Sequence, residues 1–150
     1  MKNLFEAARG EELKQRIMQM KPDSARLWGK MSPAQALEHC SRGMEMALGD
    51  KNLPRAMVGR ILGWMVKPKV MSNDEPLRRN SPTMKELVVQ DEPDLGMERA
   101  RLCGLIDRFA AAGPAGCTTH PHSFFGRLTP EEWAILMYKH LDHHLRQFGV

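Results

Sequence analysis

Cysteine is scarce in this sequence, and the spacing patterns typical of disulfide frameworks or C-x-x-C sites are missing. The chain has three cysteines, Cys40, Cys103 and Cys117, which are odd in number, widely separated and free of any C-x-x-C pair. Such usage fits a reducing compartment better than a disulfide framework. The N-terminal stretch also lacks a continuous apolar run, which argues against a signal peptide or membrane span. We therefore expect a cytoplasmic protein.

Strong charge and repetition are absent as well. The net charge of +4 is mild, so it leaves an anionic partner open without requiring nucleic acid, and we expect neither a nucleic-acid nor a membrane partner. Apolar residues make up 42% and charged residues 27%, which argues against disorder. No internal repeat or low-complexity segment occurs. The simplest organisation is one domain over residues 1–150 with a core of its own.

Strand patterns are nearly absent, whereas helical periodicity recurs along the chain. Apolar spacing and punctuation by proline and glycine predict helices over residues 4–20, 32–49, 54–66, 94–112 and 129–148. The second and fifth begin with a cap, a proline and a capping box, in SPAQ (32–35) and TPEE (129–132). Pro68 should end the third helix. These features favour an all-α four-helix bundle, with the irregular segment 67–93 as a long crossover that packs over a site or interface.

Methionine is abundant, and its abundance has two possible interpretations. Twelve methionines could indicate a copper site. Because Met44, Met57, Met65 and Met137 recur at helical spacing rather than in close clusters, core filling is the better interpretation. Other large side chains have a similar ambiguity between core packing and the wall of an apolar cavity: Trp28, Trp64, Trp133, Phe124 and Phe125. The pair Arg78 and Arg79 could anchor a substrate carboxylate or simply be solvated.

The histidines near the C-terminus divide by helical phase. At about 100° per residue, His140 and His144 lie one turn apart on the apolar face of the last helix. His143 falls on the flank of that face, and Asp142 lies nearly opposite, where we expect it to be solvated. The H-x-x-x-H spacing suits one metal ion, because side chains at i and i+4 converge and imidazole is a preferred ligand of several transition metals. A site still needs a third ligand.

His39 is the candidate for that third ligand. It lies on the inner side of the second predicted helix, where leaving an imidazole unpaired would cost about 1–3 kcal/mol. Metal ligation and an ordinary hydrogen bond would both satisfy it, and spacing alone does not decide between them. The adjacent Cys40 points about 100° away, so we expect it to be a core residue. His120 and His122 fall in a loop, where they could be solvated, act as caps or line the mouth of the same site.

Three segments carry a family resemblance, and together they cover most of the chain: LWGKMSPAQALEHC (27–40), PLRRNSPT (76–83) and HPHSFFGRLTPEEWAILMYKHLDHHLRQFG (120–149). They resemble a branch of the DinB-like superfamily, and the resemblance of the last segment is specific to that superfamily rather than generic. The resemblance implies a four-helix bundle in up-down-down-up order. It also implies a divalent-metal triad of His39, His140 and His144, with Zn or Ni as the first choice and Fe, Mn or Cu as alternatives.

The resemblance leaves the reaction open. Characterised DinB-like proteins include S-transferases that use bacillithiol, mycothiol or glutathione, and maleylpyruvate isomerases, and many form homodimers. Three neutral imidazoles leave an ion with open positions, where it could lower the pKa of a bound thiol or water. We expect a homodimer that acts as a metal-dependent thiol transferase or related enzyme on a small electrophile or a low-molecular-weight thiol. The alternatives are a non-catalytic metal- or ligand-binding bundle, for instance a stress-related one, and a helical interaction protein with packing histidines.

Further residues could contribute to this expected site. No general base follows from the sequence, and the nearest titratable groups are His143, His120 and His122. These three, together with Trp28, are the candidates for a second shell or pocket wall around the metal.

Overall fold

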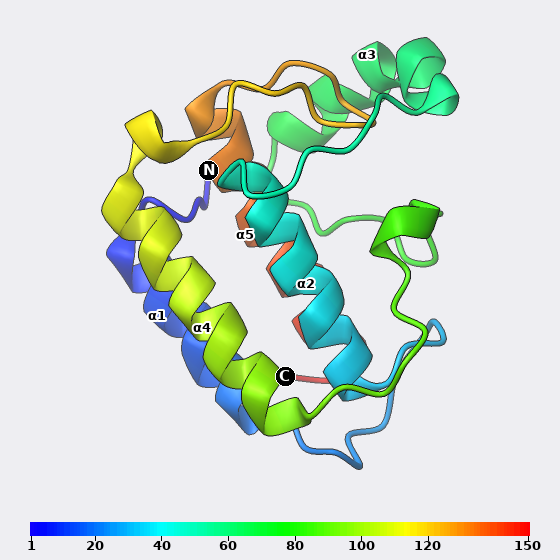
Figure 1. Cartoon of the computed structure of the whole chain (residues 1–150), viewed down its shortest axis with the longest axis vertical. Coiled ribbons are helices and arrows are strands. Elements are labelled where there is room, and N and C mark those ends of the chain that lie inside the picture. Colours follow the sequence, from blue (N-terminus) through cyan, green and yellow to red (C-terminus); the bar gives the residue numbers. More distant parts are fainter.

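The fold is entirely helical. The computed structural model describes residues 1–150 and contains the following elements: α1 (Ala7–Gln19), α2 (Pro33–Ala47), α3 (Met57–Met71), the 3-10 turn η1 (Lys85–Leu87), α4 (Leu95–Ala112), the 3-10 turn η2 (Pro114–Gly116) and α5 (Pro130–Gln147). Helices α1, α2, α4 and α5 pack side by side, whereas α3 lies at one end of this group and contacts α5 (Figure 1). The all-α prediction is confirmed. None of the helices combines the length and hydropathy that a membrane span requires.

The two strongest helix starts form as predicted. The side chains of Ser32 and Thr129 each accept a hydrogen bond from the backbone N–H three residues on. In turn, the side chains of Gln35 and Glu132 accept a hydrogen bond from the backbone N–H of the capping residue. A proline occupies the first turn of each helix, where its missing N–H is not needed. These caps set the phase of α2 and α5, the two helices that carry the candidate ligands.

The third helix does not end where the sequence predicts. It begins later and continues to Met71, with Pro68 inside it. A proline there removes one helical hydrogen bond, but contacts with neighbouring elements hold the last turns. Lys67 donates to the carbonyl of Arg127 and pairs with Glu132 of α5, and buried Lys139 of α5 donates to the carbonyl of Val70 at 2.7 Å. Tertiary contacts therefore override the local stop signal.

The core fills the space between α1, α2, α4 and α5. Its largest fully buried side chains are Trp133, Phe109, Leu4, Leu13, Ile17, Met20, Leu37, Met44, Leu102, Ile106, Leu141 and Leu145. Met44 and Met137 are buried, as the spacing predicts. Met57 and Met65 are not core residues, since they are 70% and 49% exposed on α3. The prediction was wrong for them because α3 has only one covered face.

Two glycines allow α3 to dock closely. A Cβ atom at Gly59 or Gly63 would lie 2.6 Å or 2.2 Å from the backbone oxygen of Phe124. The first turn is further fixed by the N–H of Ala56, which donates to the carbonyl of Ser123. Helix α3 thus packs directly on the backbone of the loop that precedes α5.

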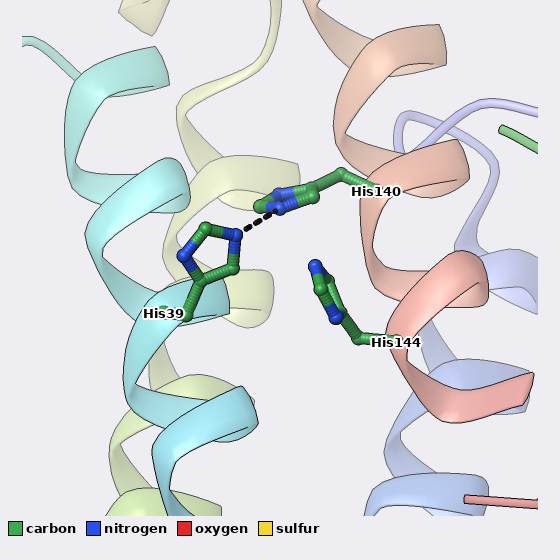
Figure 2. Close-up of side chains that lie close together, drawn as sticks. All are labelled: His39, His140 and His144. Carbon is green, nitrogen blue, oxygen red and sulfur yellow. Dashed lines mark hydrogen bonds between the residues drawn. The ribbon is translucent and has the colours of Figure 1, made fainter. Parts of the chain in front are cut away.

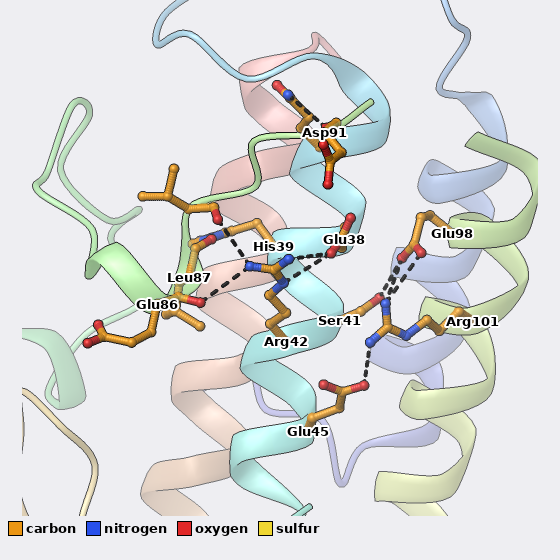
Figure 3. A network of polar contacts seen from close by, with 12 residues as sticks. Glu38, His39, Ser41, Arg42, Glu45, Glu86, Leu87, Asp91, Glu98 and Arg101 are labelled. Carbon is orange, nitrogen blue, oxygen red and sulfur yellow. Dashed lines mark hydrogen bonds and ion pairs between the residues drawn. The ribbon is translucent and has the colours of Figure 1, made fainter. Parts of the chain in front are cut away.

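The segment between α3 and α4 is pinned to α2. Arg42 of α2 pairs with Glu38 one turn earlier and donates to the carbonyls of Glu86 and Val88, which flank the end of η1 (Figure 3). Residues Lys85–Leu87 form a 3-10 turn, and the backbone at Val88 that follows is extended. As a result, the carbonyl of Leu87 faces α2 at the level of His39.

Candidate metal centre

Three histidines from two helices converge between α2 and α5. His39 comes from α2 and His140 and His144 from α5, and their potential ligand nitrogens all lie within 4.8 Å of one another (Figure 2). The Nε2 atoms of His39 and His140 are 2.9 Å apart. Two nitrogens bound about 2.1 Å from one ion lie roughly 3.0–3.4 Å apart, so this spacing is close to that of two ligands of one metal. The arrangement could hold a metal ion.

The tautomer of His39 is set by the backbone. Its Nδ1 lies 3.0 Å from the carbonyl oxygen of Leu87, which can only accept a hydrogen bond. Nδ1 therefore carries the proton, and Nε2 presents its lone pair to the two histidines of α5. A ring N–H bonded to a carbonyl is the usual second-shell arrangement of a metal-binding histidine.

His144 is fixed in the same way by a side chain. Its Nδ1 lies 2.9 Å from Oε1 of Gln147, one turn further along α5. The amide of Gln147 is itself oriented, because its nitrogen donates to the carbonyl of Trp28 at 2.8 Å. The amide oxygen thus accepts the Nδ1 proton, and Nε2 of His144 is left with a free lone pair.

His140 is the least constrained of the three. It has no protein partner other than His39, and its ring packs against Gly43, which follows His39 by one turn of α2. A Cβ atom at Gly43 would lie 3.0 Å from both Nδ1 and Cε1 of this ring. Without a metal, Nε2–H of His140 donates to Nε2 of His39. With a metal, the proton would have to move to Nδ1.

Electrostatics keep all three imidazoles neutral. Burial lowers the pKa of His144 to about 3, with His39 adding to the effect. Burial and the neighbouring His39 and His144 hold the pKa of His140 well below its ordinary range. Burial also lowers the pKa of His39, against the opposing effect of its bond to Leu87. Neutral imidazoles are the form that ligates metals.

A small cavity adjoins the triad. Its volume is about 160 Å³. It is lined by His39, Gly43, Met46, Leu77, Thr83, Leu87, His122, Phe125, Trp133, Leu136, Met137 and His140. Three of these belong to the irregular segment after α3, so this segment packs over the candidate site. The cavity is mostly apolar, with imidazoles as its main polar groups.

Two residues of the C-terminal cluster lie outside the triad. His143 is half-buried, donates from Nδ1 to the carbonyl of Leu77 at 3.2 Å and packs against Trp28. Asp142 was predicted to be solvated, which is wrong: it is only 6% exposed. Helix α1 covers that side of α5, and Arg16 of α1 and Arg146 of α5 pair with the carboxylate at 2.8 and 2.7 Å. These ion pairs compensate for its burial.

The two loop histidines differ in their position relative to the cavity. His120 is exposed and bonds through Nε2 to the carbonyl of Leu53, away from the cavity. His122 is half-buried in the cavity wall, and burial lowers its pKa to about 4.

Of the aromatic candidates, Phe125 and Trp133 line the cavity, whereas Trp64 is 72% exposed. Trp28 lies outside the cavity, with the guanidinium of Arg79 stacked on its ring. Arg79 therefore does not point into the cavity as a carboxylate anchor. Cys40 is a buried core residue, as expected, and burial raises the pKa of its thiol.

Sequence reasoning missed three contributors to this centre. Gln147 lies three residues after His144 and Gly43 four residues after His39, so helical spacing could have found both. The carbonyl of Leu87 has no sequence signal, because its position depends on how an irregular segment folds over α2.

Comparison with known proteins places the chain in a family. Residues 4–149 match the family described as "Protein of unknown function (DUF1569)". No curated protein and no solved structure matches the chain. The matched range takes in all three histidines and nearly the full sequence. The chain therefore belongs to the DUF1569 family.

Proposed function

We propose that this protein binds one divalent metal ion through His39, His140 and His144 and acts on a small molecule in the adjoining cavity. The observation that carries the proposal is that two of the three imidazoles are each held in one orientation by a hydrogen bond from Nδ1. Two of them donate from Nδ1 to oxygen atoms, so that their Nε2 lone pairs point toward a common centre with the third. A core histidine pair would need no such convergence.

The helix order supports a DinB-like relationship within this proposal. In Figure 1, α1 and α5 run from top to bottom, whereas α2 and α4 run from bottom to top. This is the pattern expected of an up-down-down-up bundle, with the segment that contains α3 as the long crossover. The position of the triad, on the second helix of the bundle and near the end of the last, agrees with it.

The reaction that we favour is transfer of a small thiol to an electrophile. Zn or Ni is our first choice, with Fe, Mn or Cu as alternatives, and such an ion would lower the pKa of a bound thiol or water. The cavity, at about 160 Å³, is smaller than the roughly 300 Å³ typical of sites for drug-sized molecules. It therefore favours a small electrophile or the reactive end of a thiol beside the histidines.

A second hollow supports a thiol with a charged body. Its volume is about 330 Å³, and it shares Met46 and Leu87 with the first cavity. Its wall contains cations and carboxylates, namely Glu38, Arg42, Lys51 and Glu86. A low-molecular-weight thiol could therefore lay its ionic groups here while its sulfur reaches the apolar cavity.

The proposal is tested in two steps. Elemental analysis should find about one transition-metal ion per chain in the purified protein and none in the variant with alanine at all three histidines. The metal-loaded protein is then screened with bacillithiol, mycothiol and glutathione against a haloarene. Metal-dependent conjugation supports the transferase, metal without conjugation favours a non-catalytic binding protein, and absence of metal binding contradicts both.

We also propose that two copies of the chain associate through α3. Met57, Ile61, Trp64 and Met65 form the outermost face of this helix, and each is between 49% and 72% exposed. No charged residue interrupts that stripe, and Arg60 and Lys69 lie at its edges. Monomers rarely expose such contiguous apolar surface, and the centres of interfaces are rich in methionine and aromatic residues and poor in charge.

A further inference from the structure

His122 occupies a turn that fixes its protonation. Its Nδ1 accepts hydrogen bonds from the backbone N–H groups of Phe124 at 3.0 Å and Phe125 at 3.2 Å. The backbone of His122 and Gly126 forms a bridge that closes the same turn. Because a backbone N–H can only donate, Nδ1 must be unprotonated and the neutral ring carries its proton on Nε2.

The same ring forms part of the cavity wall. His122 lines the cavity together with His39 and His140, and it packs against the rings of Phe125 and Trp133 at centroid distances of 5.1 and 5.4 Å. Nε2 lies on the opposite side of the imidazole from the turn, and no protein atom accepts from it. The ring cannot rotate to satisfy this donor without breaking two backbone hydrogen bonds.

The neighbouring tryptophan adds an independent observation. Trp133 also lines the cavity, is only 1% exposed, and its buried indole N–H has no acceptor in the protein. Buried donors without partners are rare, because each costs free energy on folding. The unpaired indole N–H indicates that this wall binds an acceptor atom, and the Nε2–H of His122 lies in the same wall without a protein acceptor.

We propose that His122 is a hydrogen-bond donor for an oxygen atom of the small molecule that binds beside the triad. This inference rests on the proposed metal centre and names the substrate class more narrowly: a small compound with a carbonyl or comparable oxygen. The indole N–H of Trp133 is the second donor of the same wall. A general-base role for His122 is excluded, because the lone pair of its only unprotonated nitrogen already accepts from Phe124 and Phe125.

The chemical consequence is polarisation of the bound oxygen. A fixed neutral N–H in a largely apolar cavity stabilises negative charge that develops on an oxygen, without any proton leaving the imidazole. The metal and His122 would then both act on the ligand. An electrophile without an oxygen acceptor would lose this interaction.

The test uses cobalt(II) as the metal and acetohydroxamate as a small oxygen ligand. Cobalt(II) binding is followed by its visible spectrum, and acetohydroxamate is then titrated into wild-type protein and His122→Asn. Asparagine can keep the turn, since its side-chain oxygen accepts from the backbone two residues on. The matched control is His120→Asn, two residues away at an exposed position outside the cavity.

The expected result is unchanged cobalt(II) affinity in both variants, with hydroxamate binding weakened about ten-fold or more in His122→Asn alone. A normal cobalt site with equal hydroxamate affinity in all three proteins would overturn the role of His122 and leave the metal proposal standing. Failure of wild-type protein to bind cobalt(II) would overturn both.

A second readout is independent of any metal. Long-range proton–nitrogen correlation spectra of the metal-free protein should show His122 as the Nε2-protonated tautomer. Detection of the Nδ1-protonated tautomer would contradict the proposal, whatever the variants do.

Discussion

At the scale of single residues, the three imidazoles of the candidate centre differ in what holds them. His39 is oriented by a backbone carbonyl, His144 by an amide side chain, and His140 only by its packing against Gly43. The first two are set as lone-pair donors before any metal arrives. His140 is the ring whose proton must move, so it is where metal binding and proton release should be coupled.

Gln147 should matter for metal affinity although it is not a ligand in our proposal. Replacing Gln147 by leucine removes the acceptor of the His144 Nδ1 proton, and loss of such a second-shell partner typically weakens metal binding about 10–100-fold. Calorimetric titration with Zn²⁺ measures the effect. Gln19→Leu, the same change at an exposed site at the end of α1, is the control. Equal Zn²⁺ affinity in both variants would show that Gln147 does not orient a ligand.

Gly43 provides a steric test of the same site. In Gly43→Ala, the new methyl group would lie 3.0 Å from the His140 ring and push it from its position. We expect Zn²⁺ affinity to fall by about ten-fold or more while the helices persist, as seen by circular dichroism. Gly104→Ala in α4 is the matched control, because nothing lies within 4 Å of its new methyl group. Undiminished Zn²⁺ binding by Gly43→Ala would count against His140 as a ligand.

At the scale of helices, α3 is the element whose exposed surface most needs an explanation. We expect wild-type protein to be a dimer and the double variant Ile61→Glu, Trp64→Glu to be a monomer, because charges would enter the centre of the apolar face. Light scattering coupled to size-exclusion chromatography measures the mass. Met97→Glu changes a side chain on α4 that is 72% exposed outside this face and should stay dimeric. A monomeric wild type would refute the proposed association.

What the sequence could predict about the helices depended on how local the signal was. Both capping boxes lie within four residues, and they marked α2 and α5 correctly. Pro68 is also a local signal, but Lys67 and Lys139 hold the end of α3 through contacts that span more than fifty residues. The prediction that Asp142 is solvated was wrong for the same reason, because its ion-pair partner Arg16 comes from α1, far away in the sequence.

The candidate site divides in the same way. The spacing of His140 and His144 on one face of a helix follows from the sequence alone. That His39 meets them, across 101 residues, depends on how α2 packs against α5, and periodicity shows only that each histidine faces inward. The turn around His122 and the carbonyl of Leu87 belong to irregular segments, where no period predicts orientation.

At the scale of the whole molecule, the buried histidines should make the metal-free protein sensitive to mild acid. Burial lowers the pKa of His144 to about 3 and that of His122 to about 4, below the value near 6.5 of the unfolded chain. Below pH 6.5 the unfolded state therefore binds more protons than the folded state. The free energy of unfolding is unaffected by these histidines above pH 6.5 and falls as the pH drops below it. Each such histidine lowers the unfolding free energy by up to about 1.4 kcal/mol per pH unit.

Urea denaturation at pH 7 and pH 5, in the presence of a chelator, measures this loss. The window lies above the range in which the carboxylate of Glu45 responds. Burial raises the pKa of Glu45, but its hydrogen bonds and ion pairs with Lys51 and Arg101 outweigh this effect. The resulting pKa of Glu45 is therefore below its ordinary value of 4.5. The stability that Glu45 contributes is therefore lost only in stronger acid. His122→Asn should lose less stability between the two pH values than wild type. Equal stability of wild type at pH 7 and pH 5 would contradict the buried, neutral histidines.

The most direct test of the central claim is anomalous diffraction from a crystal of the metal-loaded protein, collected on both sides of the absorption edge of the metal. We expect one anomalous peak between α2 and α5, about 2.0–2.1 Å from one nitrogen of each of His39, His140 and His144. A peak bound elsewhere, or none at the triad in protein shown to contain the metal, would contradict it.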